Sequence, residues 1–327
     1  MAETVQNILV IRLKAIGDVV FSLPAVNALH RHYPAARITF LTSRENAPLL
    51  RGFRHVREVI ALDRAALRRG NPLTVVPEIF RLLRGLRGGR FDLVVDLQGF
   101  GETAWLARLT GAAQRWGSVY GPGREWAYTR GIRRNERAHP IAWNLELLRQ
   151  CGLPDGPVEN TYALPDDIRQ TARTVLAAQH LDPARPLLVI QPMTSTEQKN
   201  WPLDRYLAVA KHWRDRQVQI LFLGGPGDVA ALEPARAAGF CVITGQPLLV
   251  SAALTENATL MLGGDTGLGH IAVALGRRLV MPIKHTNPGA TYPYAHPEWA
   301  VAPGSSQEIN DVPLDAVLAA TERLFPA

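Results

Sequence analysis

Short runs rich in valine, isoleucine and leucine alternate with segments of helical hydrophobic spacing along this sequence, and that alternation limits the possible folds most. The runs that predict β-strands in the first half are residues 7–12, 37–42, 57–62 and 91–96. Several are almost continuously apolar, which is typical of strands covered on both faces in a parallel sheet. Helical spacing lies between them, at residues 26–32, 45–50 and 77–86. This order predicts a doubly wound α/β fold.

A second series of the same kind begins near Pro186. Its predicted strands are residues 187–191, 218–223, 259–262 and 279–283. Between the two series, several prolines surround one helical stretch at residues 166–179, which marks the predicted domain boundary. We therefore expect two Rossmann-like domains, residues 1–165 and 166–327, with parallel sheets that face each other across a cleft and a last helix that can pack back on the first domain.

Composition excludes several other classes of protein. With 47% hydrophobic residues the chain can form ordinary cores, so global disorder is excluded. The longest apolar runs are far shorter than the ~18 to 20 residues that cross a bilayer, and no secretory signal is visible. Two cysteines, Cys151 and Cys241, form neither a disulfide framework nor a metal-ligand pattern, which favours a reducing cytoplasm.

Positive charge is concentrated in the first half of the chain. Residues 1–160 hold 23 basic and 14 acidic side chains, a net charge of +9, whereas the remainder holds 13 and 15, a net charge of −2. Ten arginines and only three acids lie in residues 51–90. The asymmetry predicts an anionic partner for one domain: a nucleic acid, an anionic membrane surface or a phosphorylated substrate.

A glycine and an acid follow the first predicted strand, in the segment that ends Ile16-Gly17-Asp18. In the expected fold this places the Asp18 carboxylate at the mouth of the cleft. The alternative is a helix N-cap, in which Asp18 accepts hydrogen bonds from the N–H groups of Val20 or Phe21. Because only one glycine is present, the G-x-G-x-x-G dinucleotide fingerprint is absent and a nicotinamide dehydrogenase is disfavoured.

Hydroxyl side chains and a rare lysine follow the strand predicted at residues 187–191. Thr194, Ser195 and Lys199 precede a helix that Pro202 can begin, and such a set suits the capture of phosphate oxygens. The chain has only four lysines among its 36 basic residues. The alternative interpretation is a polar surface loop.

Two glycine-rich segments follow other predicted strands. In residues 263–270, glycines let the backbone approach a ligand, and free N–H groups at the helix start can bind a diphosphate. The alternatives there are an N-cap for Asp265 and a core-facing histidine for His270. In residues 224–228, Asp228 either lies near the ribose hydroxyls of a nucleotide sugar or belongs to an ordinary β-to-α turn.

Two of these segments resemble the heptosyltransferases of lipopolysaccharide core assembly, glycosyltransferase family 9. ILVIRLKAIGDVVFSLP, residues 8–24, is similar to the opening of those enzymes, and DTGLGHIA, residues 265–272, matches their second signature. The pattern of Thr194, Ser195, Lys199 and Trp201-Pro202, and that of residues 96–99, resemble heptosyltransferase I most. The resemblance implies a GT-B fold and ADP-heptose as the sugar donor.

The resemblance also implies roles for individual residues. Asp18 matches the general base that deprotonates the acceptor hydroxyl. The positions that correspond to donor and nucleotide binding are Thr194, Ser195, Lys199, Asp228, Asp265, Thr266, Gly267 and His270. The basic positions that correspond to the anionic acceptor are Arg12, Arg64, Arg68, Arg69 and Arg124. The chain departs from the family at Glu102, which replaces a basic residue, and at Lys284, which adds a cation.

The implied reaction is an inverting transfer of heptose from ADP-heptose to the Kdo region of a lipopolysaccharide inner-core or lipid A acceptor. A lysine and helix-start N–H groups would stabilise the leaving ADP, and a carboxylate would deprotonate the acceptor hydroxyl. No Asp-x-Asp clamp or Cys/His cluster appears, so neither an obligatory metal nor a cofactor is expected. We expect a cytoplasmic protein, peripheral on the inner membrane, whose basic domain receives the anionic acceptor.

Two other functions stay open from the sequence. One is a GT-B glycosyltransferase or epimerase that uses another nucleotide sugar. The nucleotide that the protein prefers would distinguish this function from the use of ADP-heptose. The other is nucleic-acid binding, motivated by the basic half. It is disfavoured because Phe53 and Phe80 are the only aromatic rings among the arginines of residues 51–90, and we expect no nucleic-acid partner.

Overall fold

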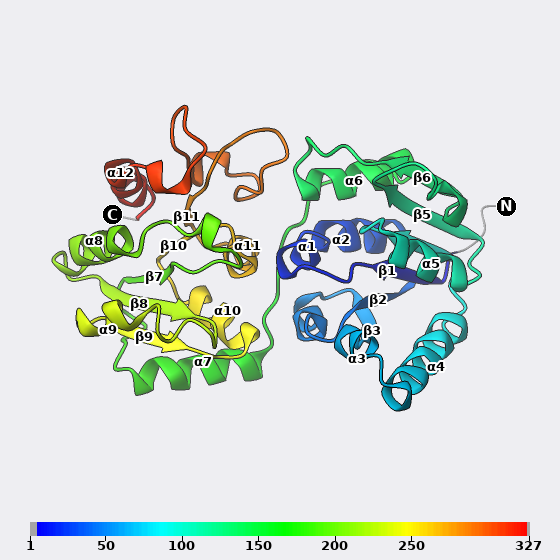
Figure 1. Ribbon diagram of the computed structural model, residues 1–327, viewed down its shortest axis with the longest axis horizontal. Helices are drawn as coiled ribbons and strands as arrows, with labels where there is room; N and C mark the ends of the chain where they lie inside the picture. The colour runs from blue at the N-terminus through cyan, green and yellow to red at the C-terminus, as the bar shows by residue number, and fades with distance from the viewer. Residues whose placement is uncertain (1–4, 326–327) are drawn as a thin grey trace. The chain divides into compact units, whose positions relative to one another are not determined.

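The structure, a computed structural model, describes residues 5–325 (Figure 1). The chain divides into two compact units, Met1–Ala163 and Leu164–Ala327, and each is described here by itself. Each unit contains one sheet of six parallel strands among the described residues. No helix within residues 5–325 is long and apolar enough to cross a membrane.

The sheet of the N-terminal unit has its most apolar strands at its centre. In sheet order the strands are β3 (Val56–Leu62), β2 (Arg37–Ser43), β1 (Asn7–Ile11), β4 (Leu93–Asp96), β5 (Gln114–Val119) and β6 (Arg130–Arg133). β1 and β4 are buried along almost their whole length, which explains their uninterrupted apolar sequences. Because Ile11 pairs with Asp96, the chain that leaves β1 runs beside the chain that leaves β4.

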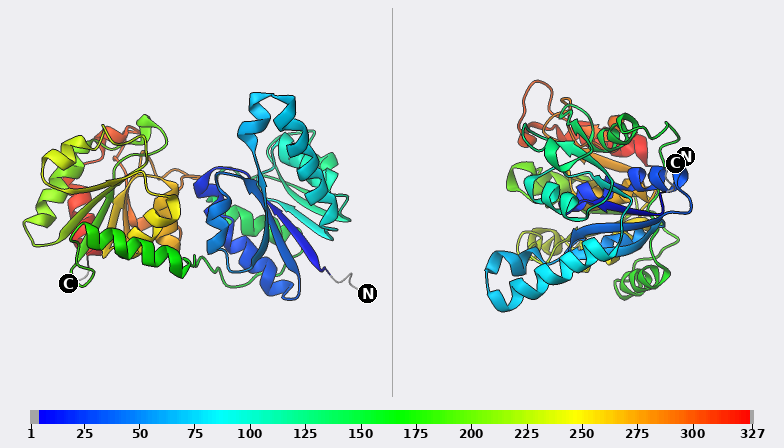
Figure 2. Two further views of the ribbon diagram at one scale, coloured as in Figure 1. Left: turned by 90° about the horizontal axis from the view of Figure 1, so that it is seen from below. Right: turned by 90° about the vertical axis from the view of Figure 1, so that its right-hand side faces the viewer.

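Helices cover both faces of this sheet (Figure 2). They are α1 (Ile16–Val20), α2 (Leu23–His32), α3 (Arg64–Arg69), α4 (Pro72–Gly88), α5 (Gly101–Leu109) and α6 (Pro140–Gln150), with 3₁₀ turns at Ala47–Gly52 and Glu125–Ala127. α4 and α5 bury apolar side chains such as Leu86 and Leu106 in the core on one face. α2 and α6 pack together on the other face.

The sheet of the C-terminal unit repeats this architecture. In sheet order its strands are β12 (Ala300–Val301), β11 (Leu279–Pro282), β10 (Leu260–Gly263), β7 (Leu187–Gln191), β8 (Gln219–Gly224) and β9 (Cys241–Thr244). β10 lies directly beside β7, and Gly263 pairs with Gln191 at their carboxyl ends. The loops that leave these two strands therefore start side by side, although they are far apart in the sequence.

The helices of the C-terminal unit also divide between two faces (Figure 1). They are α7 (Asp166–Ala178), α8 (Leu203–Arg214), α9 (Glu233–Ala237), α10 (Leu248–Glu256), α11 (Gly267–Ala274) and α12 (Leu314–Leu324), with 3₁₀ turns at Glu197–Lys199, Pro297–Trp299 and Ile309–Asp311. α8, α9 and α12 share one apolar core with the sheet. α10 and α11 pack against each other, and α7 packs on α10.

Two predicted helices are corrected by these elements. Residues 45–50 were expected as an α-helix but form a 3₁₀ turn that starts at Ala47, and the helix expected at residues 77–86 starts five residues earlier. An Asn71 side chain caps that earlier start by accepting a hydrogen bond from the Leu73 N–H at 3.0 Å. The last helix, α12, buries Val317 and Ala320 in the core of the C-terminal unit.

Candidate active site

The predicted donor-binding residues follow adjacent strands of the C-terminal sheet. Lys199 follows β7, Asp265 follows β10, Asp228 follows β8 and Lys284 follows β11. All four strands run parallel and are consecutive in the sheet, so their carboxyl ends meet at one edge. Ligands of open α/β sheets bind at this edge, which makes it the candidate donor site.

Asp265 is the centre of a polar cluster at this edge. One of its oxygens, Oδ1, lies 2.9 Å from Nε2 of the buried His270. The other, Oδ2, accepts hydrogen bonds from Lys199 Nζ at 2.7 Å and from the Thr291 hydroxyl at 2.8 Å. With both oxygens bound, Asp265 orients the donors around it. It is not the N-cap considered from the sequence, because Thr266 holds that position.

The surroundings of Asp265 stabilise its charged form. Burial favours the neutral acid, but the hydrogen bonds and charges of His270 and Lys199 outweigh burial. The pKa of Asp265 therefore lies well below its ordinary value. A carboxyl group whose pKa is depressed in the folded state contributes stability above the pKa of the unfolded state, about 3.9, and loses it as the pH falls.

Asp265→Asn is expected to lower the free energy of unfolding at neutral pH by about 1 to 3 kcal/mol, because the Lys199 ammonium group loses its anionic partner and the amide NH₂ replaces one of the two acceptor oxygens. The difference between wild type and variant should shrink as the pH falls below about 4, where the wild-type carboxylate loses its advantage. Denaturant titrations from neutral to acidic pH measure this. Asp315→Asn, at an exposed position with no ion pair in the part of the chain described, is the control. A difference in the free energy of unfolding between wild type and Asp265→Asn that stays constant with pH would contradict the lowered pKa of Asp265.

The start of α11 presents backbone N–H groups beside this cluster. Thr266 caps the helix: its hydroxyl accepts a hydrogen bond from the Gly269 N–H at 3.1 Å and donates one to Gln191 Oε1 at 2.7 Å. Gly264 lets the two loops approach, since a Cβ there would lie 2.7 Å from the Thr194 methyl group. The N–H groups of Gly267 and its neighbour lack partners within the helix and suit an anion.

A pocket of about 210 Å³ opens beside Lys199 and Asp265. The further residues that line it are Pro282, Ile283, Lys284, His285, Gly289, Ala290, Thr291 and Ile309. Thr291 was not predicted as a site residue, and its place could not be read from the sequence because it lies in an irregular segment 26 residues beyond Asp265. Lys284, a departure from the family pattern, adds a second cation to the wall.

The remaining predicted donor residues lie outside the Asp265 cluster. The Thr194 hydroxyl donates a hydrogen bond to the Thr196 carbonyl at 2.8 Å, and Ser195 beside it is exposed. Asp228 accepts a hydrogen bond from the Gly225 N–H at 2.7 Å, which closes the turn after β8. This contact fits the alternative of an ordinary β-to-α turn.

Asp18 and Arg12 form an ion pair at the carboxyl end of β1. Asp18 Oδ1 lies 2.7 Å from Arg12, and Oδ2 accepts a hydrogen bond from the Ala15 N–H at 3.1 Å. Asp18 is the third residue of α1 and not its N-cap, which is Ala15. About a third of the Asp18 side chain is exposed, whereas Arg12 is buried and also donates to the Leu97 carbonyl. Arg12 therefore positions Asp18, and a solute can still reach the carboxylate.

The loop that carries Asp18 is fixed from the neighbouring strand. Gln98 Oε1 accepts a hydrogen bond from the Leu13 N–H at 2.8 Å. The Gln98 N–H in turn donates to Asp96, whose second oxygen accepts a hydrogen bond from the Tyr128 hydroxyl at 2.7 Å. Complete burial raises the pKa of Asp96 in spite of these hydrogen bonds. Reasoning from the sequence missed this support, although residues 96–99 had been singled out.

The arginines predicted to contact an anionic acceptor differ in how far they are engaged. Arg64 is held by Glu102 at 2.9 Å, so this departure from the family supplies an internal partner. Arg124 donates to the Gly99 carbonyl at 3.2 Å. Arg68 and Arg69, in the last turn of α3, are exposed and make no ion pair with any residue that the structure describes.

One partly buried arginine near Asp18 was not predicted. Arg134 lies 4.8 Å from the Tyr120 ring centre, and within residues 5–325 its buried Nη1 has no hydrogen-bond partner. Burial is the main cause that lowers its pKa, and the charges of Arg12 and Asp18 also act on it. An unsatisfied buried guanidinium nitrogen suits an anionic ligand. Sequence reasoning missed it because nothing in the sequence distinguishes Arg134 from the many exposed arginines.

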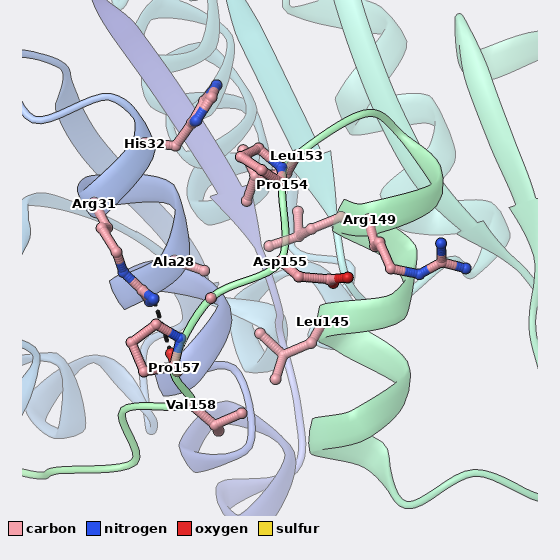
Figure 3. A pocket seen from close by; sticks show the side chains of 12 residues that line it. Ala28, Arg31, His32, Leu145, Arg149, Leu153, Pro154, Asp155, Pro157 and Val158 are labelled. Atoms are coloured by element: carbon pink, nitrogen blue, oxygen red, sulfur yellow. Dashed lines mark hydrogen bonds between the residues drawn. The ribbon is translucent and has the colours of Figure 1, made fainter.

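A further pocket, of about 220 Å³, lies between α2, α6 and residues 153–158 of the N-terminal unit (Figure 3). It contains none of the predicted site residues. Its arginines are engaged: Arg31 donates to the Pro157 carbonyl at 2.9 Å, and Arg149 pairs with Glu146 at 2.6 Å. We therefore assign it no part in the site.

Comparison with known structures confirms the fold class. The glycosyl transferase family 9 structure from Veillonella parvula DSM 2008 superposes with a TM-score of 0.87 at 20% identity, covering 99% of this chain and 98% of that one. The E. coli heptosyltransferase WaaC with ADP-2-deoxy-2-fluoro heptose gives a TM-score of 0.78 at 20% identity, covering 97% and 99%. These similarities confirm the predicted GT-B class of two Rossmann-like α/β units.

Sequence comparison gives the family itself. Lipopolysaccharide heptosyltransferase 3 of Escherichia coli strain K12 is 25% identical over 335 residues, with 95% of each chain covered. The specific likeness to heptosyltransferase I stays a prediction. The family model for glycosyltransferase family 9 (heptosyltransferase) matches residues 79–311, well over half of the chain. The chain therefore belongs to glycosyltransferase family 9, the heptosyltransferases, and is a glycosyltransferase.

Proposed function

We propose that this enzyme transfers heptose from ADP-heptose to the Kdo region of a lipopolysaccharide inner-core or lipid A acceptor, with inversion at the anomeric carbon. The observation that carries the proposal is the placement of Lys199 beside the start of α11, on the wall of a pocket. Family membership supports sugar transfer, and the similar WaaC structure with a fluorinated ADP-heptose supports the donor.

The C-terminal unit is proposed to hold the donor through its diphosphate. Lys199 and Lys284 supply positive charge at the pocket, and the free N–H groups at the start of α11 supply donors with fixed directions. As the bond between the anomeric carbon and the diphosphate oxygen breaks, its electron pair leaves with ADP. These groups stabilise the charge that develops there. Thr194, Ser195, Asp228 and His270 are proposed to complete the donor site.

Asp18 is proposed as the general base. The oxygen of an acceptor hydroxyl attacks the anomeric carbon from the side opposite ADP, a new C–O bond forms, and the hydroxyl proton passes to the Asp18 carboxylate. Each carboxylate oxygen can accept more than one hydrogen bond, so Arg12 and the Ala15 N–H hold Asp18 in place without occupying all of its lone pairs. The mechanism uses no group outside the chain and its two substrates.

The N-terminal unit is proposed to bind the anionic acceptor. Arg134, with a buried nitrogen that lacks a partner, and Arg124 are the candidates for its carboxylate or phosphate groups. Arg68 and Arg69 add unpaired positive charge, whereas Arg12 acts through Asp18 and Arg64 is engaged with Glu102. Because such an acceptor is anchored in lipid, we propose that the enzyme works at the cytoplasmic face of the inner membrane.

The proposal is tested by nucleotide preference and by product formation. ADP is expected to raise the melting temperature of the protein, whereas UDP, GDP and TDP should raise it less, because a ligand stabilises the folded state in proportion to its binding. With ADP-heptose and a Kdo–lipid A acceptor, mass spectrometry should detect one added heptose. Preference for UDP or GDP would support the alternative, a GT-B enzyme or epimerase with another nucleotide sugar, and would refute the proposed donor.

A further inference from the structure

Helix α4 turns an apolar face away from the unit to which it belongs. The exposed fractions of Leu73, Val76 and Phe80 are 84%, 63% and 67%. With Pro77, these positions follow the spacing i, i+3, i+4, i+7 and therefore lie on one side of the helix. Contiguous exposed apolar side chains on a folded domain mark an interaction surface.

The opposite side of α4 already forms the contact with the sheet. Leu82 and Leu86 are buried in the core, and Glu78 is buried with its carboxylate bound to Arg81 at 2.6 Å and to the Asp63 N–H at 2.8 Å. The outward apolar residues are thus not needed for packing within the unit. Helix spacing continues their line to Arg84 and Arg87. We call Leu73, Val76, Phe80, Arg84 and Arg87 together the α4 face.

The unpaired charges on and around the α4 face are all positive. The three acids of residues 51–90 are neutralised: Glu58 pairs with Arg37 at 3.0 Å, Asp63 with Arg44 at 2.7 Å, and Glu78 with Arg81. Among the described residues, the basic side chains near the face that make no ion pair are Arg68, Arg69, Arg84 and Arg87. The surface therefore combines exposed apolar groups with uncompensated positive charge.

The α4 face also belongs to the most prominent corner of its unit. Figures 1 and 2 show the junction of α3 and α4 projecting from the N-terminal unit. Leu73 lies in the first turn of α4, and Arg69 ends α3 just before it. Apolar and basic side chains are thus presented together on a protrusion, which allows them to enter an interface while the sheet stays outside it.

We propose that the α4 face docks the protein on an anionic lipid bilayer, with Leu73, Val76 and Phe80 inserted at the level of the headgroups and the arginines against lipid phosphates. Helices of this composition bind membrane surfaces through apolar burial and attraction to anionic lipids. A second copy of the chain is a poorer occupant, because a symmetric contact would bring like charges together. The inference rests on the proposed function only in that a lipid-anchored acceptor gives the docking its purpose.

Flotation of the full-length protein with vesicles tests the proposal. Wild type is expected to bind vesicles of phosphatidylethanolamine with phosphatidylglycerol and to bind pure phosphatidylcholine weakly. Leu73→Ser/Phe80→Ser should lower the partition coefficient roughly 100-fold or more, since each of the two lost apolar side chains is worth about tenfold or more when buried. Arg84→Gln/Arg87→Gln should lower it roughly 10- to 30-fold at low salt and flatten its salt dependence.

The control is Val158→Ser, which removes an apolar side chain of the same unit that is 45% exposed and lies outside the α4 face. It should bind vesicles like wild type, and all variants should keep the wild-type melting temperature because the altered side chains are exposed. Wild-type protein that does not bind anionic vesicles, or serine variants that bind equally well, would overturn the proposal. So would self-association without lipid that the serine variants abolish.

Transfer to a water-soluble acceptor without lipid chains separates this inference from the proposed function. Leu73→Ser/Phe80→Ser should keep the wild-type rate on that acceptor while losing vesicle binding. Vesicle binding through α4 without any heptose transfer would refute the proposed function and leave the docking surface in place. Heptose transfer by a wild-type protein that does not bind vesicles would support the proposed function and refute the docking surface.

Discussion

Asp18→Asn is expected to lower kcat by about 10²- to 10⁴-fold, the usual contribution of a general base. Asparagine has nearly the same size, and its oxygen can still accept the hydrogen bond from the Ala15 N–H. It cannot take the proton of the acceptor hydroxyl. ADP affinity should stay close to wild type, because the proposed donor residues belong to the other unit. Steady-state kinetics with ADP-heptose and calorimetry with ADP measure the two effects.

A structural cost accompanies this substitution and has to be measured beside it. Arg12 is buried and loses its anionic partner, which we expect to cost about 1 to 2 kcal/mol of stability, since Asp18 is a third exposed. Glu146→Gln is the matched control, because it breaks the ion pair with Arg149 in the same unit. It should leave kcat unchanged. A folded Asp18→Asn enzyme with near wild-type turnover would reject Asp18 as the base and leave it the role of partner to Arg12 and Ala15.

Lys199→Ala is expected to weaken ADP binding about 10- to 150-fold, as for the loss of a charge-assisted hydrogen bond worth about 1.5 to 3 kcal/mol. Asp265 would retain His270 and Thr291 as partners, so the cluster should stay formed. The rate of transfer should fall as well, because the same charge is proposed to stabilise the leaving group. Isothermal calorimetry with ADP is the direct measurement.

Lys211→Ala is the matched control for this variant. It removes one lysine charge from the same unit, at an exposed position in the last turn of α8. ADP affinity should not change, since Lys211 lies outside the donor pocket. Unchanged affinity in Lys199→Ala would remove Lys199 from the site. An equal loss in both variants would mean that only the net charge of the unit matters.

The strands that could be predicted from the sequence are those with continuous apolar runs. β7 was predicted with the bounds that the structure has, because Leu187–Gln191 is nearly all apolar and bounded by prolines. β5, β6, β9 and β12 were not predicted. β6, with the sequence RGIR, lies at the edge of its sheet and is largely exposed, so no apolar pattern is required there. β5, with the sequence QRWGSV, contains polar residues and a glycine, whereas β9 and β12 have only four and two residues.

For the candidate site too, residues in a local motif could be predicted from the sequence, whereas contacts that depend on packing could not. Asp18 and Arg12 are six positions apart, and a local motif was enough to single out both. Lys199 and Asp265 were each singled out, but their contact spans 66 residues and depends on β10 lying beside β7, which no local pattern encodes. The burial of the Arg134 Nη1 atom depends on packing in the same way, and the sequence context of Arg134 resembles that of any surface arginine.

The ion pair between Lys199 and Asp265 bears on how a turnover cycle would end. If Lys199 binds the diphosphate as proposed, the ligand must draw the ammonium group away from a carboxylate that already holds it at 2.7 Å. Asp265 then acts as an internal competitor for the same cation. The competition from Asp265 lowers the affinity of Lys199 for every anion, ADP included. Asp265 also gives Lys199 an immediate ion-pair partner when the product departs. In this arrangement the affinity for ADP is lower than Lys199 alone would give, and ADP dissociates faster after transfer.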